Sequence, residues 1–311
     1  MTEFHHVSVL LQECIDGLNI RPDGIYVDGT LGGAGHSSQI AKRLTTGRLI
    51  GIDRDPIALK AAGERLEPYK DKVTLVHSNF CEIKQVLDDL NIEGVDGILL
   101  DLGVSSPQLD DGQRGFSYMA DAPLDMRMNN EDPLTAYTVV NTWSQEELKR
   151  ILYTYGEERY APQIAAAICR RREEKPIYTT FELCDVIRSA MPAAALREKQ
   201  HPAKRSFQAI RIAVNDELGA VEKIMEDAIG LLNPGGRLAI ITFHSLEDRI
   251  VKNGMAQAAK GCTCPPNFPV CVCGKKPQVK ILSRKPITAS QEELTENPRS
   301  RSAKLRVCEK I

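Results

Sequence analysis

The sequence predicts an α/β protein in which a seven-stranded, Rossmann-like sheet carries an inserted all-helical subdomain. Three features of the 311-residue chain support this prediction. Short apolar segments alternate with helical patterns near both ends, a glycine-rich turn follows the first of these segments, and the central part lacks strand patterns. We therefore expect the sheet domain to comprise residues 1–106 and 206–311, with the helical subdomain at residues 107–205.

The first part of the sheet domain contains four short apolar strand patterns. They cover residues 26–28, 48–53, 73–76 and 97–100, and helical patterns at residues 57–67 and 82–90 separate the later ones. Fully apolar strands of this length are typical of parallel sheets that are covered on both faces. The alternation therefore indicates consecutive βαβ units.

The expected helical subdomain begins where the strand patterns end. Ser144 with Glu147, and Thr179 with Glu182, have the spacing of capping boxes, in which each side chain bonds the backbone of the other residue. An apolar stripe at helical spacing follows each pair. Helices should therefore start at both positions.

The sheet pattern returns in the last third of the chain. A further helix should begin at Ser245, with Asp248 completing its N-terminal cap. A long helix is expected before it, over residues 207–232, and strands are expected over residues 237–243, 279–283 and 303–307. These three strands bring the expected number to seven.

The segment from Tyr26 to His36 is the most informative functional feature. It joins an apolar strand to a glycine-rich turn and a helical pattern, which is where α/β sheets bind nucleotide-like cofactors. A dinucleotide fingerprint needs a third glycine three positions after Gly35, but Ser38 stands there. S-adenosylmethionine has no phosphates and needs close backbone approach and acidic partners. This cofactor therefore fits better, while a plain strand-to-helix turn stays open as an alternative.

Two carboxylates end the second and fourth strand patterns. Asp53 has the separation from the glycine turn expected of a residue that binds both ribose hydroxyls; alternatively, it caps the helix before Pro56. Asp101 should face the crevice at the carboxyl ends of the strands, where reaction centres lie. Ser105 and Ser106 follow it as candidate catalytic hydroxyls or as ordinary helix caps.

Composition limits the classes of partner. The net charge is −2, so no global positive field indicates a nucleic-acid partner, and any RNA contact must be local. The absence of a basic-then-apolar leader and of an apolar run of membrane-spanning length predicts a cytoplasmic protein without a membrane partner. Of the nine cysteines, the five scattered ones are expected to be reduced thiols.

The other four cysteines form one metal-like pattern, in which Cys262 and Cys264 precede Cys271 and Cys273. Four thiols in one short segment could bind zinc tetrahedrally in a structural role. The C-x-C spacing is tighter than the common C-x-x-C spacing, and no histidine accompanies it. The main functional hypothesis needs no metal, and the zinc hypothesis stays open beside it.

Six segments in order make the chain resemble the bacterial ribosomal RNA small subunit methyltransferase H family over nearly its whole length. This resemblance implies a class I S-adenosylmethionine-dependent methyltransferase that modifies the exocyclic N4 amine of a cytidine in 16S ribosomal RNA of the small ribosomal subunit. It leaves a homodimer possible. The segments that carry the resemblance are residues 28–36, 101–110, 114–117, 123–128, 201–205 and 243–249.

The resemblance also implies roles for individual residues. The cofactor contacts would be Ala34, Gly35, His36, Asp53, Phe80, Asp101 and Gln108, and the helical insertion would help to hold the RNA. From the residues themselves we add Gly33 as a cofactor contact, Asp101, Ser105 and Ser106 as catalytic candidates, and Phe116, Lys204, Arg205 and His244 as substrate-binding candidates. No metal ligand is included.

Asp101 also has a chemical reason to lie at the reaction centre. The cytosine amine is a poor nucleophile because its lone pair is delocalised, so an acceptor on its N–H favours pyramidal nitrogen and helps the proton leave. Many amino-methyltransferases place two prolines and an aromatic residue after this acid, but this chain has Leu102, Gly103 and Val104 there. The partner that stacks on the base must therefore come from elsewhere, with Phe116, Tyr118 and His244 as candidates.

Other functions compatible with the same cofactor sheet are a DNA or small-molecule methyltransferase and a non-catalytic RNA-binding factor. A basic cluster where the insertion rejoins the sheet favours RNA, and the two carboxylates in the crevice favour catalysis. Solvated helix faces are the simpler explanation for the arginines at residues 170–172 and for the basic residues near the C-terminus. The basic cluster comprises Arg197, Lys199, His201, Lys204, Arg205 and Arg211.

Overall fold

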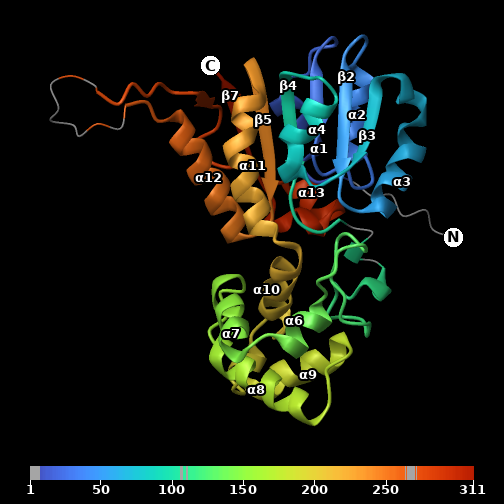
Figure 1. Cartoon of the computed structure of the whole chain (residues 1–311), viewed down its shortest axis with the longest axis vertical. Helices are drawn as coiled ribbons and strands as arrows, with labels where there is room; N and C mark the ends of the chain where they lie inside the picture. Colours follow the sequence, from blue (N-terminus) through green and yellow to red (C-terminus); the bar gives the residue numbers. More distant parts are fainter. Residues whose placement is uncertain (1–7, 106–107, 110, 263, 265–269, 271) are drawn as a thin grey trace. The chain divides into compact units, whose positions relative to one another are not determined.

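A computed structural model of the chain describes residues 8–105, 108–109, 111–262, 264, 270 and 272–311 (Figure 1). The chain forms two compact units, one made of Met1–Gly103 with Leu218–Ile311 and the other of Val104–Glu217. The sequence placed the insertion at residues 107–205, whereas the second unit also includes the helix that follows Ala203.

The first unit is built on the expected seven-stranded sheet, in the order β3-β2-β1-β4-β5-β7-β6. Neighbouring strands are parallel except for β7, which is antiparallel to both β5 and β6. The strands are β1 (Ile25–Asp28), β2 (Arg48–Asp53), β3 (Val73–His77), β4 (Val95–Asp101), β5 (Leu232–Thr242), β6 (Val279–Ile281) and β7 (Lys304–Lys310). The α/β fold prediction is confirmed.

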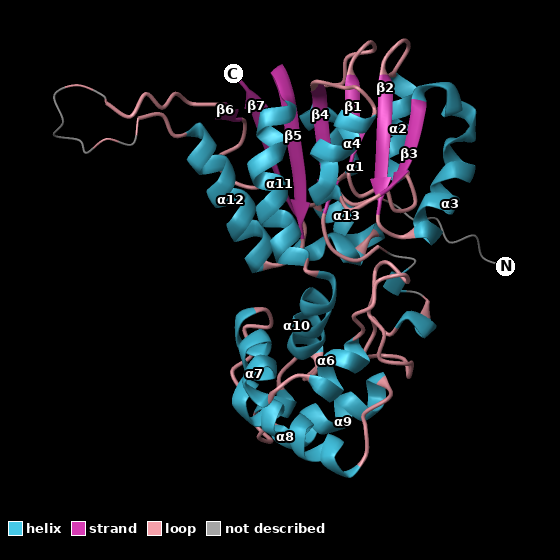
Figure 2. Ribbon diagram, viewed as in Figure 1, coloured by secondary structure: helices cyan, strands magenta, loops and turns pink. Residues whose placement is uncertain are grey.

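The central strands are apolar because helices cover both faces of the sheet (Figure 2). One face packs on α4, α11 and α12, and the other packs on α1, α2 and α3. Residues Val95 to Leu100 of β4 are accordingly all buried. The α-helices of this unit are α1 (Leu11–Leu18), α2 (Gly35–Arg43), α3 (Pro56–Leu66), α4 (Ile83–Asp89), α11 (Glu217–Leu231), α12 (Ser245–Ala259) and α13 (Gln291–Glu296). Short 3₁₀ turns lie at η1 (Glu67–Lys72), η2 (Phe80–Glu82) and η5 (Pro298–Ser302).

The regular elements described in the second unit are all helices, apart from a single bridge between Pro123 and Thr179, and turns and loops connect them. Its buried core is apolar and includes Leu148, Ile164 and Leu183 from three different helices. The elements are η3 (Gly112–Arg114), α6 (Ala136–Thr142), α7 (Gln145–Thr154), α8 (Ala161–Glu174), α9 (Thr180–Ala190), η4 (Ala195–Arg197) and α10 (Lys204–Asn215). Both expected capping boxes are present at the starts of α7 and α9.

Two expectations about helices are wrong. The long helix expected over residues 207–232 is divided into α10 and α11, because Asp216 between them adopts a left-handed conformation with φ of 47°. The N-cap of α12 is His244, which forms a capping box with Glu247. Asp248 instead forms ion pairs with Lys304 and Arg306 of β7.

The strand bounds also differ from the sequence pattern near the glycine pair at residues 235–236. The turn-like Pro234-Gly235-Gly236 lies within β5, where the register with β4 shifts between Val95 and Gly97. The irregularity lets the strand accommodate a sequence that resembles a turn.

In the part of the chain that the structure describes, no helix combines the length and apolar character needed to span a bilayer.

Candidate active site

Three carboxylates lie at one edge of the sheet. Asp28, Asp53 and Asp101 are the last residues of β1, β2 and β4, which are neighbouring parallel strands. The carboxyl ends of parallel strands meet at the same edge, which is where open α/β sheets bind their ligands. The topology therefore brings both predicted acids together, and it adds a third acid to which the sequence analysis gave no separate role.

Asp28 has structural partners that explain its position. It accepts a hydrogen bond from Ser37 Oγ at 2.7 Å and one from the Thr30 N–H at 3.2 Å. Burial raises the pKa of Asp28 to about 6, while these hydrogen bonds act in the opposite direction. Asp28 thus ties the end of β1 to the following turn and to α2.

The glycine turn after β1 has a constrained backbone. Gly32 and Ala34 have φ angles of +47° and +56°, and the Ala34 N–H donates to the Leu31 carbonyl at 2.7 Å. A Cβ added at Gly35 would overlap Ser8, whereas a Cβ added at Gly33 would meet no protein atom within 4 Å. The backbone at Gly33 therefore borders open space, as a backbone that a ligand approaches closely must.

Asp53 is fixed by backbone amides. Its carboxylate accepts from the Gly32 N–H at 2.7 Å and from the Asp55 N–H at 2.9 Å, and burial raises its pKa. The helix cap before Pro56 is made by Asp55, whose side chain accepts from the Ile57 N–H at 3.0 Å. The alternative role of Asp53 as that cap is therefore wrong. These bonds, with one from the Arg54 backbone, leave part of its acceptor capacity unused.

Asp101 has the least satisfied carboxylate of the three. Its backbone N–H donates to Thr30 Oγ1 at 2.6 Å, which ties the end of β4 to the turn after β1. Its Oδ1 atom is buried and has no hydrogen-bond partner among the residues that the structure describes. Burial raises the pKa of Asp101 to about 8, and the negative charges of Asp28 and Glu247 add to this shift.

His36 lies beside this carboxylate. It is a buried residue of α2, and its Nε2 lies 3.0 Å from the Val9 carbonyl oxygen. A carbonyl only accepts, so we assign the proton of the neutral ring to Nε2. The other ring nitrogen, Nδ1, then carries the lone pair and lies 3.9 Å from Asp101 Oδ2. His36 is thus held in one orientation next to Asp101.

Phe80 lies at the same edge of the sheet. It begins η2 after β3, and a Cβ added at Gly29 would lie 3.0 Å from its Cβ atom. The ring is partly buried against the apolar core of the first unit. Both roles considered from the sequence, a core ring and a cover for an adenine, therefore remain predictions.

Most of the predicted site residues that follow Gly103 in the chain belong to the second unit, and His244 belongs to the first. Ser105 and Gln108 form two reciprocal bonds, from the Ser105 N–H to Gln108 Oε1 at 3.1 Å and from the Gln108 N–H to Ser105 Oγ at 3.4 Å. This is the geometry of a helix cap, which was the simpler interpretation of Ser105. Ser106 lies outside the described residues.

The aromatic candidates for base stacking have different surroundings. Phe116 is only 6% exposed and lies in the core of the second unit. His244 is the partly buried N-cap of α12, and its Nε2 lies 3.1 Å from Glu247 Oε1. Tyr118 is partly exposed and stacks on His201, with ring centroids 4.5 Å apart. The sequence could not separate these three, because their burial depends on tertiary packing.

The basic residues divide into structural and available groups. Lys204 is exposed at the start of α10, and Arg205 donates to the Glu157 carbonyl at 3.3 Å. Arg211 is neutralised by a two-bond contact with Glu217 at 2.8 and 2.9 Å. Lys204 therefore has the exposure that a phosphate contact requires, whereas Arg211 is committed to the fold.

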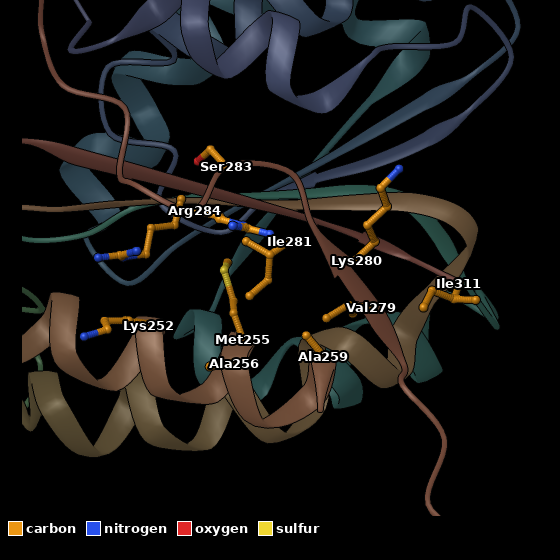
Figure 3. Close-up of a pocket in the computed structure, with 11 residues that line it drawn as sticks. Lys252, Met255, Ala256, Ala259, Val279, Lys280, Ile281, Ser283, Arg284 and Ile311 are labelled. Atoms are coloured by element: carbon orange, nitrogen blue, oxygen red, sulfur yellow. The ribbon is translucent and has the colours of Figure 1, made fainter. Parts of the chain in front are cut away.

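A pocket of about 580 Å³ lies elsewhere in the first unit (Figure 3). Its apolar side chains include Met255 of α12 and Val279 of β6, and Lys252 and Arg284 lie among the basic residues that line it. None of the residues predicted from the sequence lines this pocket. It therefore does not belong to the carboxylate edge described above.

Comparison with known proteins identifies close relatives over the whole chain. The model of a family described as the MraW methylase family matches residues 3–311. The chain is 60% identical over 309 residues to "Ribosomal RNA small subunit methyltransferase H" of Brevibacillus brevis, covering 99% of this chain and 98% of that protein. It is 58% identical over 311 residues to the protein of the same name from Heliobacterium mobile, covering 99% and 100%.

The raised pKa of Asp101 predicts a measurable cost in stability. The raised pKa lets the folded state keep the Asp101 proton up to about pH 8, whereas an unperturbed aspartate has a pKa of 3.8. Between these values the folded state binds more protons than the unfolded state, so stability falls as pH rises. We expect Asp101→Asn to remove the contribution of this group to the pH dependence of stability. Relative to the original protein, the free energy of unfolding of the variant should then increase as the pH rises from 5 to 9. Urea unfolding of both proteins across this range measures the difference, and parallel pH profiles would contradict the shift.

Proposed function

Because the chain belongs to the MraW methylase family, we propose that it methylates the exocyclic N4 amine of a cytidine in 16S ribosomal RNA, with S-adenosylmethionine as the methyl donor. The chain is a class I S-adenosylmethionine-dependent methyltransferase. The observation that best supports the specific reaction is the buried Asp101 Oδ1, which lacks a partner among the described residues. A buried acceptor is costly to leave unsatisfied, which suggests that a ligand donates to it.

The edge of the sheet fits the cofactor. The open space beside Gly33 suits close approach of a ligand to the backbone, and Asp53 retains acceptor capacity for ribose hydroxyls. Ala34, Gly35 and His36 continue the same turn into α2. When bound, S-adenosylmethionine supplies an electrophilic methyl group on a positively charged sulfur. The protein's part is to hold that methyl group in line with the attacking nitrogen and to exclude water.

Asp101 would act as the acceptor for the amine N–H. Its carboxyl group must be ionised to take up the amine proton, and burial opposes ionisation in the protein alone. A positive charge nearby favours the carboxylate form, so a bound sulfonium would lower the pKa of Asp101. An ionised Asp101 can then hold the amine hydrogen and take up charge as the nitrogen becomes pyramidal. The same carboxyl group would thus couple cofactor binding to activation of the nucleophile.

The target amine lies on the Watson–Crick edge of cytosine, so the base must be unpaired or taken out of its stack before transfer. We assign RNA binding to the helical unit, with Lys204 and Arg205 as phosphate contacts. Among the aromatic candidates, Tyr118 is the least committed to a core or a cap, so we favour it for stacking over Phe116 and His244. The proposed substrate is the RNA within the small ribosomal subunit, in the cytoplasm, and a homodimer is compatible with this role.

The proposed substrate can be tested directly. Incubation with labelled S-adenosylmethionine and naked 16S RNA, assembled small subunits or DNA, followed by mass spectrometry of the nucleosides, identifies the modified base. We expect N4-methylcytidine in one or both RNA samples and none in DNA. Methylation of DNA alone, or of a base other than cytidine, would contradict the proposal.

Replacement of Asp101 should separate chemistry from cofactor binding. We expect Asp101→Ala to lower turnover at least about a hundredfold, because the acceptor for the amine is lost, while the dissociation constant for S-adenosylmethionine changes by less than about tenfold. Single-turnover kinetics and calorimetry measure the two quantities. Turnover equal to that of the original protein would remove Asp101 from the mechanism.

Gly33 allows a sharp test of close backbone approach. An alanine methyl at this position meets no protein atom within 4 Å, and the residue does not have positive φ, so Gly33→Ala should fold normally. We expect it to weaken S-adenosylmethionine binding by at least about tenfold, because the methyl occupies the space that the ligand needs. Gly230→Ala in α11 is the matched control, since its added methyl also meets no atom within 4 Å. Equal affinities for both variants would place the cofactor away from Gly33.

Asp53 should contribute to affinity more than to turnover. We expect Asp53→Asn to weaken S-adenosylmethionine binding by about 1 to 3 kcal/mol, because an amide group replaces acceptors for the ribose hydroxyls. Asparagine can keep its oxygen toward the Gly32 N–H, so the glycine turn should survive, although the bond from the Asp55 N–H is lost. Calorimetry with S-adenosylmethionine measures the change. An unaltered dissociation constant would show that other groups bind the ribose.

A further inference from the structure

A cluster of thiols lies outside the carboxylate edge, in the segment that joins α12 to β6. The ligand atoms of Cys262, Cys264 and Cys273 all lie within 4.8 Å of one another. The Sγ atoms of Cys262 and Cys273 are 3.7 Å apart. Three sulfur atoms that converge in this way form three corners of a tetrahedral site of the kind that binds a soft divalent metal.

Apolar packing does not explain why these thiols converge. None of the described residues between positions 260 and 278 is buried, and the side chains of Val270 and Val272 are 69% and 74% exposed. At its base the segment is closed by a hydrogen bond from the Gln278 N–H to the Ala258 carbonyl at 2.9 Å. Because none of the described residues of this short segment is buried, it needs another source of order, and a bound metal is one that small protein modules commonly use.

Backbone N–H groups point at two of the sulfur atoms. The Cys264 N–H donates to Cys262 Sγ, and the Val272 N–H donates to Cys264 Sγ, both at 3.4 Å. The sequence from residue 260 to residue 278 contains three lysines and no acidic residue, so the local charge is also positive. Thiolate is the form of cysteine that binds metal.

We propose that Cys262, Cys264 and Cys273 bind one Zn²⁺ ion in a structural site. Zinc prefers tetrahedral sulfur ligation, and sites made of cysteine alone are typically structural. Each thiol would release its proton to solvent as its sulfur–zinc bond forms. No fourth histidine, cysteine or acidic residue joins the cluster among the residues that the structure describes. The sequence supplies one more thiol at Cys271, which lies outside those residues.

The role of the metal would be to order the segment between α12 and β6. Gly274, directly after Cys273, has a φ of +63°, so the chain turns sharply once the third thiol is in place. The ion would therefore link the two arms of the segment, none of whose described residues is buried. This role is independent of methyl transfer, so the site can be tested without RNA.

The test uses the full chain, purified under reducing conditions without chelator. We expect about one zinc per chain by elemental mass spectrometry, and we expect Co²⁺-substituted protein to show the visible absorption of tetrahedral thiolate ligation. Single Cys262→Ser, Cys264→Ser and Cys273→Ser variants should lower zinc affinity at least about tenfold. Cys169→Ser, which changes a partly buried cysteine of α8, is the matched control and should keep its zinc.

A second readout tests the structural role. Chelator should make the segment between residues 260 and 278 sensitive to limited proteolysis, while S-adenosylmethionine affinity stays the same, and added Zn²⁺ should restore resistance. Absence of stoichiometric zinc in the reduced protein would overturn the proposal, whatever the behaviour of the variants. Disulfide bonds among these cysteines in freshly reduced protein, or full zinc content in all three serine variants, would also overturn it.

Discussion

The buried carboxyl group of Asp101 is the feature on which the active edge of this protein depends. It ends β4, its backbone is bonded to Thr30 in the turn after β1, and it lies near Asp28 and His36. Three acids on neighbouring parallel strands repel one another and are partly removed from water. The fold tolerates this arrangement because the surrounding strands bury large apolar areas on both faces of the sheet. Stability supplied by the core thus permits a carboxyl group that is unfavourable in the protein alone.

The same edge explains why a positively charged cofactor suits this sheet. A cation near Asp28, Asp53 and Asp101 would relieve their mutual repulsion, whereas a pyrophosphate would increase it. The turn after β1 also lacks the third glycine of a dinucleotide site and has Ser38 in that place. Backbone spacing and charge therefore favour the same class of ligand, and each does so independently of the relatives' names.

Much of the fold could be predicted because it depends on local patterns. The apolar strand segments and the capping boxes at Ser144 and Thr179 contain their own signals, and the structure has strands and helices there. The break at Asp216 carries only a weak signal, since aspartate favours caps and turns but no glycine or proline marks this position. The burial of Phe116 depends on which helices pack around it, and this information is spread over the whole second unit. The sequence could therefore predict the site residues at the ends of strands. It could not predict the site residues whose burial depends on how helices pack.

The hydrogen-bond partners of the three acids distinguish the structural carboxylates from the functional one. From the sequence, each is an aspartate at the end of an apolar strand, and pattern alone gives them equal standing. In the structure, Asp28 is bonded by Ser37 and Thr30, and Asp53 is bonded by backbone amides. Only the buried oxygen of Asp101 lacks a partner among the described residues. A buried oxygen without a partner calls for an explanation, and a ligand that donates to it is one, so this oxygen supports placing the chemistry at Asp101.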